Sequence, residues 1–132
     1  MFTVTDAFAQ FKLNLELAKA HRKLVRKLII IRLAGDAVSA GDSTTAIKLA
    51  IKYYKYSGGG YNPCVNAIMI DALMQHVTSL VEQAWEVRTL DDKLVFAQQA
   101  FTDIEKYKKW LMPYSREDTV YHLQMMAGEI ID

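Results

Sequence analysis

The sequence predicts an all-α protein, a single bundle of four to five helices. Proline is scarce, with 2 among 132 residues, and glycine occurs 6 times, which suits long helices. Apolar residues recur at intervals of three and four, and no segment of useful length alternates apolar and polar residues as a strand does. A hydrophobic fraction of 52% and a charged fraction of 23% are typical of a globular domain and argue against a disordered chain.

A long first helix is expected over residues 6–33, which contain neither glycine nor proline. At about 100° per residue, its main apolar face gathers Leu13, Leu17, Ala20, Leu24, Leu28 and Ile31. A second, smaller stripe contains Phe11, Ala18, Val25 and Ile29. We therefore expect this helix to be packed on two sides, and Gly35 to stop it.

A short second helix is expected over residues 44–56, after a linker of small residues at 36–43. Ser43 or Thr44 can cap its first turn, because a side-chain oxygen at that position accepts an otherwise unpaired backbone N–H. The apolar side of this helix contains Ile47, Ala50, Ile51 and Tyr54.

Three consecutive glycines at 58–60 mark the clearest break in the chain. Asn62 and Pro63 then fit an N-cap followed by proline at the first helical position, which begins a third helix over residues 63–88. Its core stripe contains Ile70, Leu73, Val77, Leu80, Val81 and Ala84.

Two further helices are expected over residues 91–111 and 116–131. Thr89 begins a capping box before the first of them, with aspartate in place of the usual Glu or Gln, and Pro113 ends that helix. Their core positions are Phe96, Ala97, Ala100, Phe101, Ile104 and Leu111, then Val120, Leu123, Ala127, Ile130 and Ile131.

Charge is divided unequally between the two halves of the chain. The first 66 residues contain ten Lys or Arg and four acids, whereas the last 66 contain six Lys or Arg and eleven acids. The formal net charge of the whole chain is nevertheless only +1. This asymmetry indicates either a polyanionic partner for the first half or head-to-tail association of copies.

The basic residues of the first half are interleaved with aromatic residues. Lys12, Lys19, Arg22, Lys23 and Arg26 gather on one arc of the first helix with Lys27 at its margin, and Lys48, Lys52 and Lys55 form one stripe on the second. Lysine and arginine neutralise phosphates, and Tyr53 or Tyr56 could stack on unpaired bases. The pattern predicts binding to the backbone of RNA or single-stranded DNA without sequence specificity. The alternative is a lysine-rich solvated face with Tyr54 in the core.

No pattern of catalytic or metal-binding residues is evident. The three histidines, His21, His76 and His122, fall on three different helices without metal-ligand spacing. We expect His76 to be half-buried and hydrogen-bonded. Glu82 and Glu86 lack a second acidic pair, and Cys64 lacks a base. We therefore expect a protein that is not an enzyme and that holds no cofactor and no metal.

The methionine and tryptophan residues indicate a second possible class of function, protein binding. Met69, Met74, Met125 and Met126, with Trp85 and Trp110, could form an adaptable protein-binding face, although such residues at helical spacing are more often core. On this alternative, the chain is a protein-binding adaptor or an oligomeric scaffold with no nucleic-acid role.

The sequence also bears on location. One cysteine allows no intrachain disulfide, and the first eleven residues have neither the basic start nor the apolar core of a signal peptide. The longest aliphatic run covers only residues 28–31. We expect a cytoplasmic protein with no membrane partner.

Residues 47–63 resemble part of the small helical subunits of CRISPR interference complexes. In this segment Lys52-Tyr53-Tyr54-Lys55 leads through Ser57-Gly58-Gly59-Gly60 to Asn62-Pro63, which is similar to the helix, glycine turn and next helix of those subunits. The aromatic helix over residues 101–110 is similar in kind. The resemblance implies a non-catalytic small subunit of an antiviral ribonucleoprotein complex, which lies beside larger protein subunits and contacts nucleic-acid backbone.

A rival resemblance covers residues 96–131. Two helices separated by residues 113–118 look like the end of the four-helix accessory proteins of diversity-generating retroelements. That resemblance likewise implies nucleic-acid binding beside a larger enzyme.

Overall fold

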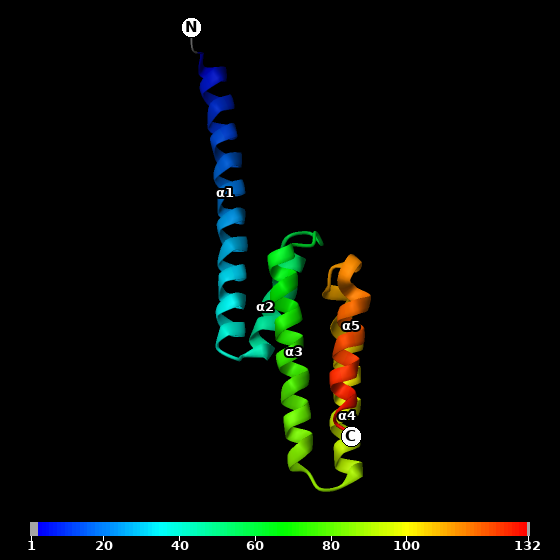
Figure 1. The fold of residues 1–132 in the computed structure, drawn as a ribbon. Helices are drawn as coiled ribbons and strands as arrows, with labels where there is room; N and C mark the ends of the chain where they lie inside the picture. The colour runs from blue at the N-terminus through cyan, green and yellow to red at the C-terminus, as the bar shows by residue number, and fades with distance from the viewer. Residues whose placement is uncertain (1–2, 132) are drawn as a thin grey trace.

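The computed structural model describes residues 3–131, and these contain five α-helices, one short 3-10 helix and no strand (Figure 1). The α-helices are α1 (Val4–Ser39), α2 (Ser43–Tyr56), α3 (Pro63–Glu86), α4 (Leu90–Tyr107) and α5 (Pro113–Gly128), and the 3-10 helix η1 is Lys108–Trp110. The predicted all-α class is therefore confirmed.

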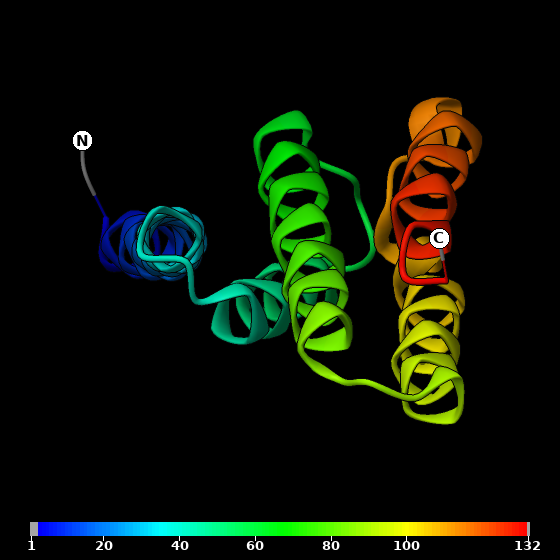
Figure 2. The same ribbon diagram turned by 60° about the horizontal axis from the view of Figure 1, so that its bottom comes forward.

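The helices form three layers, with α1 on one side, α2 and α3 in the middle, and α4 and α5 on the other side (Figures 1 and 2). The central helix α3 packs against α1, α2, α4 and α5. One hydrophobic cluster runs across all three layers, from Ile30 of α1 to Leu123 of α5. The predicted core stripe of α3 is confirmed in its main part, because Leu73, Val77 and Ala84 are buried.

The first helix is longer and less buried than the sequence predicts. It extends past the other helices, and every residue from Thr3 to Arg26 is exposed (Figure 1). We call residues 4–25 the arm; at about 1.5 Å per residue it is roughly 33 Å long. The predicted main core face of this helix is wrong: Leu13, Leu17, Ala20, Leu24 and Leu28 are exposed, and only Ile31 is partly buried.

The predicted end of the first helix is also wrong. Gly35 does not stop the helix, which continues to Ser39. The helix is packed on both sides of this position, since Ala34 and Ala37 are buried, and a Cβ at Gly35 would lie at an ordinary van der Waals distance, 3.9 Å, from Cδ1 of Ile68 in α3. Contact with the neighbouring helix thus favours the helical conformation despite the low helix propensity of glycine.

The predicted linker over residues 36–43 shortens to three residues. Gly41 makes the turn with φ of 77°, a value that glycine adopts without strain. Asp42 caps α2, in place of the expected Ser43 or Thr44, and its carboxylate accepts the N–H of Thr45 at 3.2 Å. Hydrogen bonds from Thr45 lower the pKa of Asp42 below its usual 3.8.

The remaining boundaries differ by a few residues. Asn62 and Pro63 begin α3 as predicted, but α3 ends at Glu86 rather than at residue 88. The helix predicted over 91–111 divides into α4 and η1, and Pro113 is the first residue of α5 rather than only a stop. Two predicted core residues are instead exposed, Phe101 and Ile131.

One helix passes a length and composition test for membrane spanning. This is α3, in which 44% of the most apolar window is buried. Because α3 is in contact with four other helices, its apolar composition has a structural role within the bundle.

Candidate nucleic-acid interface

The predicted basic residues meet where α2 ends against α1. A hollow of about 230 Å³ lies between the two helices, lined by Lys19, Arg22, Lys23, Arg26 and Tyr56. Five of the eleven residues predicted to bind nucleic acid therefore lie around one site, although they come from two helices that a turn separates.

Two further hollows continue this surface along α2. The first has a volume of about 390 Å³ and shares Arg26 and Tyr56 with the basic hollow, and its other lining residues are Ile29, Ile30, Leu33, Leu49 and Lys52. The next also measures about 390 Å³ and is lined by Lys48, Ile51, Lys52 and Lys55. We call the seven cations of this continuous surface the basic strip: Lys19, Arg22, Lys23, Arg26, Lys48, Lys52 and Lys55.

The charges of the basic strip are largely uncompensated within the chain. Among residues 3–131, its single ion pair is Lys19 with Glu16, at 3.9 Å, and both side chains are more than half exposed. Such a pair contributes little, because water screens it. The other two ion pairs lie elsewhere, between His76 and Asp103 and between Lys108 and Glu105. The strip is thus a surface of positive charge that, within residues 3–131, has one weak ion pair.

Three of the predicted binding residues do not line any of these three hollows. Lys12 is on the arm, with its ammonium 4.7 Å from the ring centroid of Phe8. Lys27 is partly buried at the margin of the contact between α1 and the other helices. The prediction that Tyr53 stacks on bases is contradicted: Tyr53 is 7% exposed, and its hydroxyl accepts a hydrogen bond from Asn62. Only Tyr56 remains as a partly exposed tyrosine on this surface.

The aromatic residues beside the strip are structural. Tyr54 is 2% exposed, in agreement with the alternative that the sequence left open for it, and its ring is stacked parallel to Trp110 at 6.2 Å. Burial raises the pKa of Tyr54 to about 12. Tyr61 packs edge-on against Tyr54, and its hydroxyl donates to the carbonyl of Lys109. This cluster fixes the end of α2, and with it the position of Tyr56.

The glycine turn after α2 is a poor phosphate site. Gly58 and Gly59 have positive φ, so the turn depends on glycine. The N–H groups that begin α3 are already used, because Oδ1 of Asn62 accepts those of Cys64 and Val65 at 2.8 and 3.2 Å. The turn therefore connects two helices and leaves these donors unavailable to an anion.

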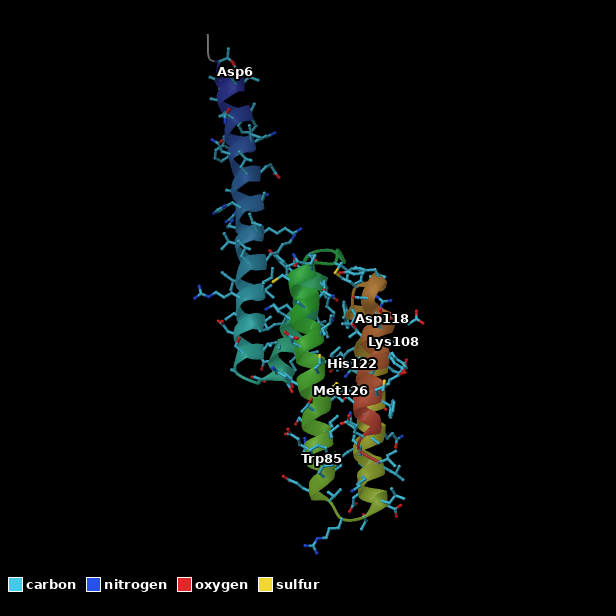
Figure 3. All side chains as sticks on the ribbon, in the orientation of Figure 1. Asp6, Trp85, Lys108, Asp118, His122 and Met126 are labelled. Carbon is cyan, nitrogen blue, oxygen red and sulfur yellow. The ribbon has the colours of Figure 1, made fainter. Side chains whose placement is uncertain are left out.

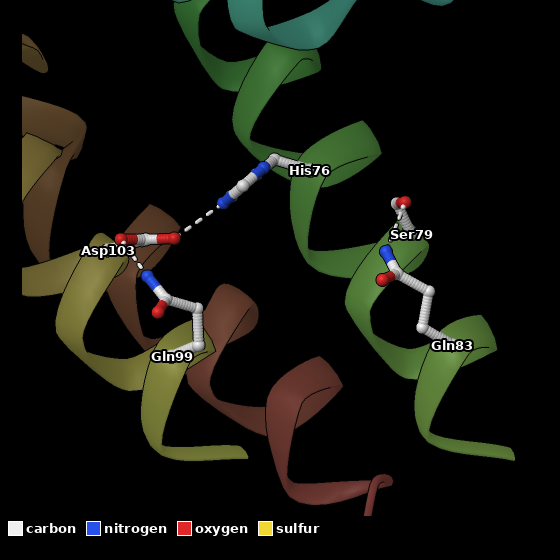
Figure 4. Close-up of polar contacts among 5 residues, drawn as sticks. All are labelled: His76, Ser79, Gln83, Gln99 and Asp103. Atoms are coloured by element: carbon white, nitrogen blue, oxygen red, sulfur yellow. Dashed lines mark hydrogen bonds and ion pairs between the residues drawn. The ribbon is translucent and has the colours of Figure 1, made fainter. Parts of the chain in front are cut away.

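The His76 prediction is confirmed. Nε2 of His76 lies 2.6 Å from Oδ2 of Asp103, and the other carboxylate oxygen accepts a hydrogen bond from Gln99 (Figure 4). Asp103 is 9% exposed, so this contact joins α3 to α4 inside the bundle. No group of three or more His, Cys, Asp or Glu residues suited to a metal ion occurs within residues 3–131.

The methionine and tryptophan residues divide into two groups. Met69 is fully buried, and Met74 and Trp110 are partly buried against the core, so these three are structural. Trp85 is 63% exposed beside Met126, and with Glu82 and Glu129 they line a hollow of about 90 Å³ between α3 and α5 (Figure 3). Met125 is 59% exposed. Met126 is itself partly buried against the core, so the exposed members of the predicted protein-binding face are Trp85 and Met125.

Another hollow, of about 550 Å³, lies along α5 and was not foreseen from the sequence. It is lined in part by Arg116, whose guanidinium donates to the carbonyls of Leu111 and Lys109 and to the hydroxyl of Tyr61. Because these contacts join the start of α5 to the turn before it, Arg116 has a structural role there. No sequence pattern indicates this hollow, since its residues are spread along a helix face of mixed character.

Comparison with known proteins identified no relative of this chain. No protein-family model, no curated protein and no solved structure matches this chain.

Proposed function

We propose that this protein is a non-catalytic helical subunit of a ribonucleoprotein complex and that it binds nucleic-acid backbone along the basic strip. The observation that supports the proposal is a continuous surface with seven cations and one weak internal ion pair. Phosphate groups would supply the negative charges that these cations can pair with, and phosphate binding releases condensed counterions.

The arrangement favours backbone contact over base reading. The cations lie on exposed faces of two neighbouring helices and along the hollows between them, where lysine and arginine can neutralise phosphates without contacting base edges. Tyr56, partly exposed where two of the hollows meet, is placed to stack on a base of a single strand. RNA or single-stranded DNA is therefore the proposed ligand.

The resemblance of residues 47–63 to the small subunits of CRISPR interference complexes agrees with this role. On that basis the proposed setting is a cytoplasmic antiviral complex in which larger protein subunits cover other faces of the chain. The rival resemblance to accessory proteins of diversity-generating retroelements leads to the same proposed ligand class.

A protein-binding adaptor is the second candidate, and the exposure of Trp85 and Met125 favours it. Salt separates the two candidates, because apolar association does not weaken as ionic strength rises, whereas phosphate binding does.

The test is binding of a labelled single strand and of an RNA duplex to the full chain at several salt concentrations. We expect log K to fall against log salt with a slope of roughly −3 to −6, as for four to seven neutralised phosphates. The triple variant Lys48→Glu, Lys52→Glu, Lys55→Glu should weaken binding at least about tenfold for all sequences alike.

The matched control places the same charge change on the other side of the bundle, as Lys106→Glu, Lys108→Glu, Lys109→Glu. This control should retain most of the affinity. Equal losses in the two triple variants would show that only net charge matters, and unchanged binding in the first would exclude α2 as the contact surface.

A further inference from the structure

The exposed arm carries a heptad pattern that the proposed function does not use. Apolar positions alternate at spacings of four and three from Val4 to Ile29, and Leu33 follows one helical turn after Ile29. Large apolar side chains occupy most of them, and we call this set the phenylalanine stripe: Val4, Phe8, Phe11, Leu15, Val25, Ile29 and Leu33, with Ala18 and Arg22 at the intervening positions. Such a repeat, sustained over more than three heptads, is typical of a helix that packs against another helix.

Nothing in the chain covers this stripe. Phe8 and Phe11 are 59% and 62% exposed, and the other five large side chains range from 38% to 88%. Monomeric soluble proteins rarely expose a continuous apolar patch of this extent, and an isolated helix of this length is only marginally stable in water. The arm therefore needs a partner both for its apolar surface and for its helical conformation.

The stripe runs directly into an apolar hollow at the base of the arm. Ile29 and Leu33, the last two members of the stripe, line the hollow of about 390 Å³ between α1 and α2, and Leu49 of α2 lies across from them. The same helix thus has projecting phenylalanines at one end and a receiving hollow at the other.

The two ends match when one copy of α1 is reversed against another. With the midpoint between Ala18 and Lys19, an antiparallel alignment sets Phe8 opposite Ile29 and Val4 opposite Leu33, while Phe11 falls opposite Arg26, next to Val25. We propose that the arm docks on a second copy of this chain, in an antiparallel, two-fold symmetric dimer. Phe8 of each copy then enters the α1–α2 hollow of its mate, as expected of an isologous interface.

The area available is sufficient for a stable dimer. At these exposures each phenylalanine loses roughly 100 Å² on burial, so the four phenylalanines of the pair contribute about 400 Å². The aliphatic members of both stripes, together with the hollow walls that they cover, bring the total above the roughly 1,000 Å² that a specific interface requires.

A head-to-tail arrangement, with the basic arm on the acidic half of a neighbour, fits less well. The apolar hollow on that half, beside Trp85, measures about 90 Å³, which is too small for a row of phenylalanines.

Charge also separates the antiparallel arrangement from the head-to-tail one. In the antiparallel pair, Lys12 lies within one residue of Arg26 of the mate and Lys19 lies beside its own equivalent at the centre, so like charges come close together. Salt should therefore leave the proposed dimer unchanged or strengthen it, whereas it would weaken the head-to-tail contact.

The proposed dimer would also place the basic residues of both arms on one face. A two-fold axis perpendicular to a pair of antiparallel helices keeps the same side of each helix on the same side of the pair. Lys12, Lys19 and Arg26 of the two copies would form one continuous basic surface. A polyanion bound to this surface would offset the repulsion between the like charges. The dimer itself does not depend on that ligand.

The first test is the mass of the full chain in solution, measured by sedimentation equilibrium without nucleic acid. We expect a dimer whose dissociation constant does not rise as sodium chloride is increased above about 0.15 M. The variant Phe8→Asp, Phe11→Asp should be monomeric, with a dissociation constant raised at least about 100-fold. The bundle should stay folded, because both side chains are exposed in the single chain.

The control is Leu17→Asp, Leu24→Asp, which places the same charges on the other apolar face of the arm. Both leucines are exposed, at 59% and 55%, and this variant should remain dimeric. A monomeric wild-type chain would overturn the proposal, as would a dimer that this control dissociates and the phenylalanine variant does not.

The second test fixes the direction of the helices. In a Cys64→Ser background, which removes the single exposed cysteine, the pair Val4→Cys with Leu33→Cys should form an intermolecular disulfide under oxidation. Val4→Cys alone should not. Cross-linking by Val4→Cys alone would indicate parallel helices, and no cross-link in either variant would indicate a head-to-tail contact; each result overturns the antiparallel dimer. Because no nucleic acid is present, these outcomes are separate from those of the binding test.

Discussion

The arm and the rest of the bundle use the same sequence pattern with opposite results. In both regions, apolar residues recur at intervals of three and four residues. Leu123 is nevertheless fully buried, whereas Leu17, on the arm, is 59% exposed. The periodicity of a helix indicates which face is to be covered. It does not indicate whether the cover comes from the same chain, and on the arm no element of residues 3–131 covers the face that the sequence assigns to the core.

Polar contacts separate the two regions in the same way. In the bundle they join distant elements: Oδ1 of Asn66 accepts the N–H of Met112 at 2.8 Å, and His76 contacts Asp103. On the arm and at its cap, the polar side-chain contacts join residues three or four apart, as between Gln10 and Asn14 at 3.0 Å. We therefore expect the bundle to unfold cooperatively and the arm to contribute little to that transition.

The largest expected contrast comes from deleting a leucine side chain in each region. Leu123→Ala removes a fully buried side chain at the centre of the core and should lower the free energy of unfolding by about 2–5 kcal/mol. Leu17→Ala should leave it unchanged, because the side chain is exposed and lies off the phenylalanine stripe. Urea denaturation followed by circular dichroism measures both. Equal losses would mean that the arm is part of the cooperative core.

An intermediate contrast comes from one ion pair in each region. Asp103→Ala leaves His76 and Gln99 without their shared acceptor inside the bundle, and should cost about 1–3 kcal/mol of unfolding free energy. Glu16→Ala removes the exposed partner of Lys19 and should have no measurable effect on the same denaturation curve. Asp103→Asn is the control, because asparagine keeps the shape of the side chain without its charge. If Asp103→Asn lowers the free energy of unfolding as much as Asp103→Ala does, the carboxylate itself is required.

The fold class and most helix starts follow from the sequence because their causes are local. Asn62 and Pro63 begin α3 as predicted, and Thr89 accepts the N–H of Asp92 at the start of α4. The stop at Gly35 was wrong because the helix is packed against the bundle at Ala34 and Ala37, and this packing outweighs the low helix propensity of glycine. A single sequence contains no sign of such a neighbour.

The candidate site was predictable in its residue types but not in its arrangement. The spacing of Lys48, Lys52 and Lys55 fixes their common face, and the arc on α1 follows from the same periodicity. That Arg26 and Tyr56 line the same hollows depends on how α1 crosses α2, which is a tertiary property. Tyr53 was misassigned for a related reason: α2 is covered on more of its circumference than its apolar stripe alone indicates.

The smallest expected contrast is between two helix caps. Asn62→Ala removes the acceptor for two N–H groups at the start of the central helix and should cost about 1 kcal/mol of unfolding free energy. Thr3→Ala removes the cap of the arm, where the Thr3 hydroxyl accepts the N–H of Asp6 at 3.1 Å. It should reduce the helical signal by about one turn without moving the denaturation midpoint, since the arm frays independently. A midpoint lowered by Thr3→Ala as much as by Asn62→Ala would mean that the arm and the bundle unfold together, and that the contrast between the two regions does not extend to their stability.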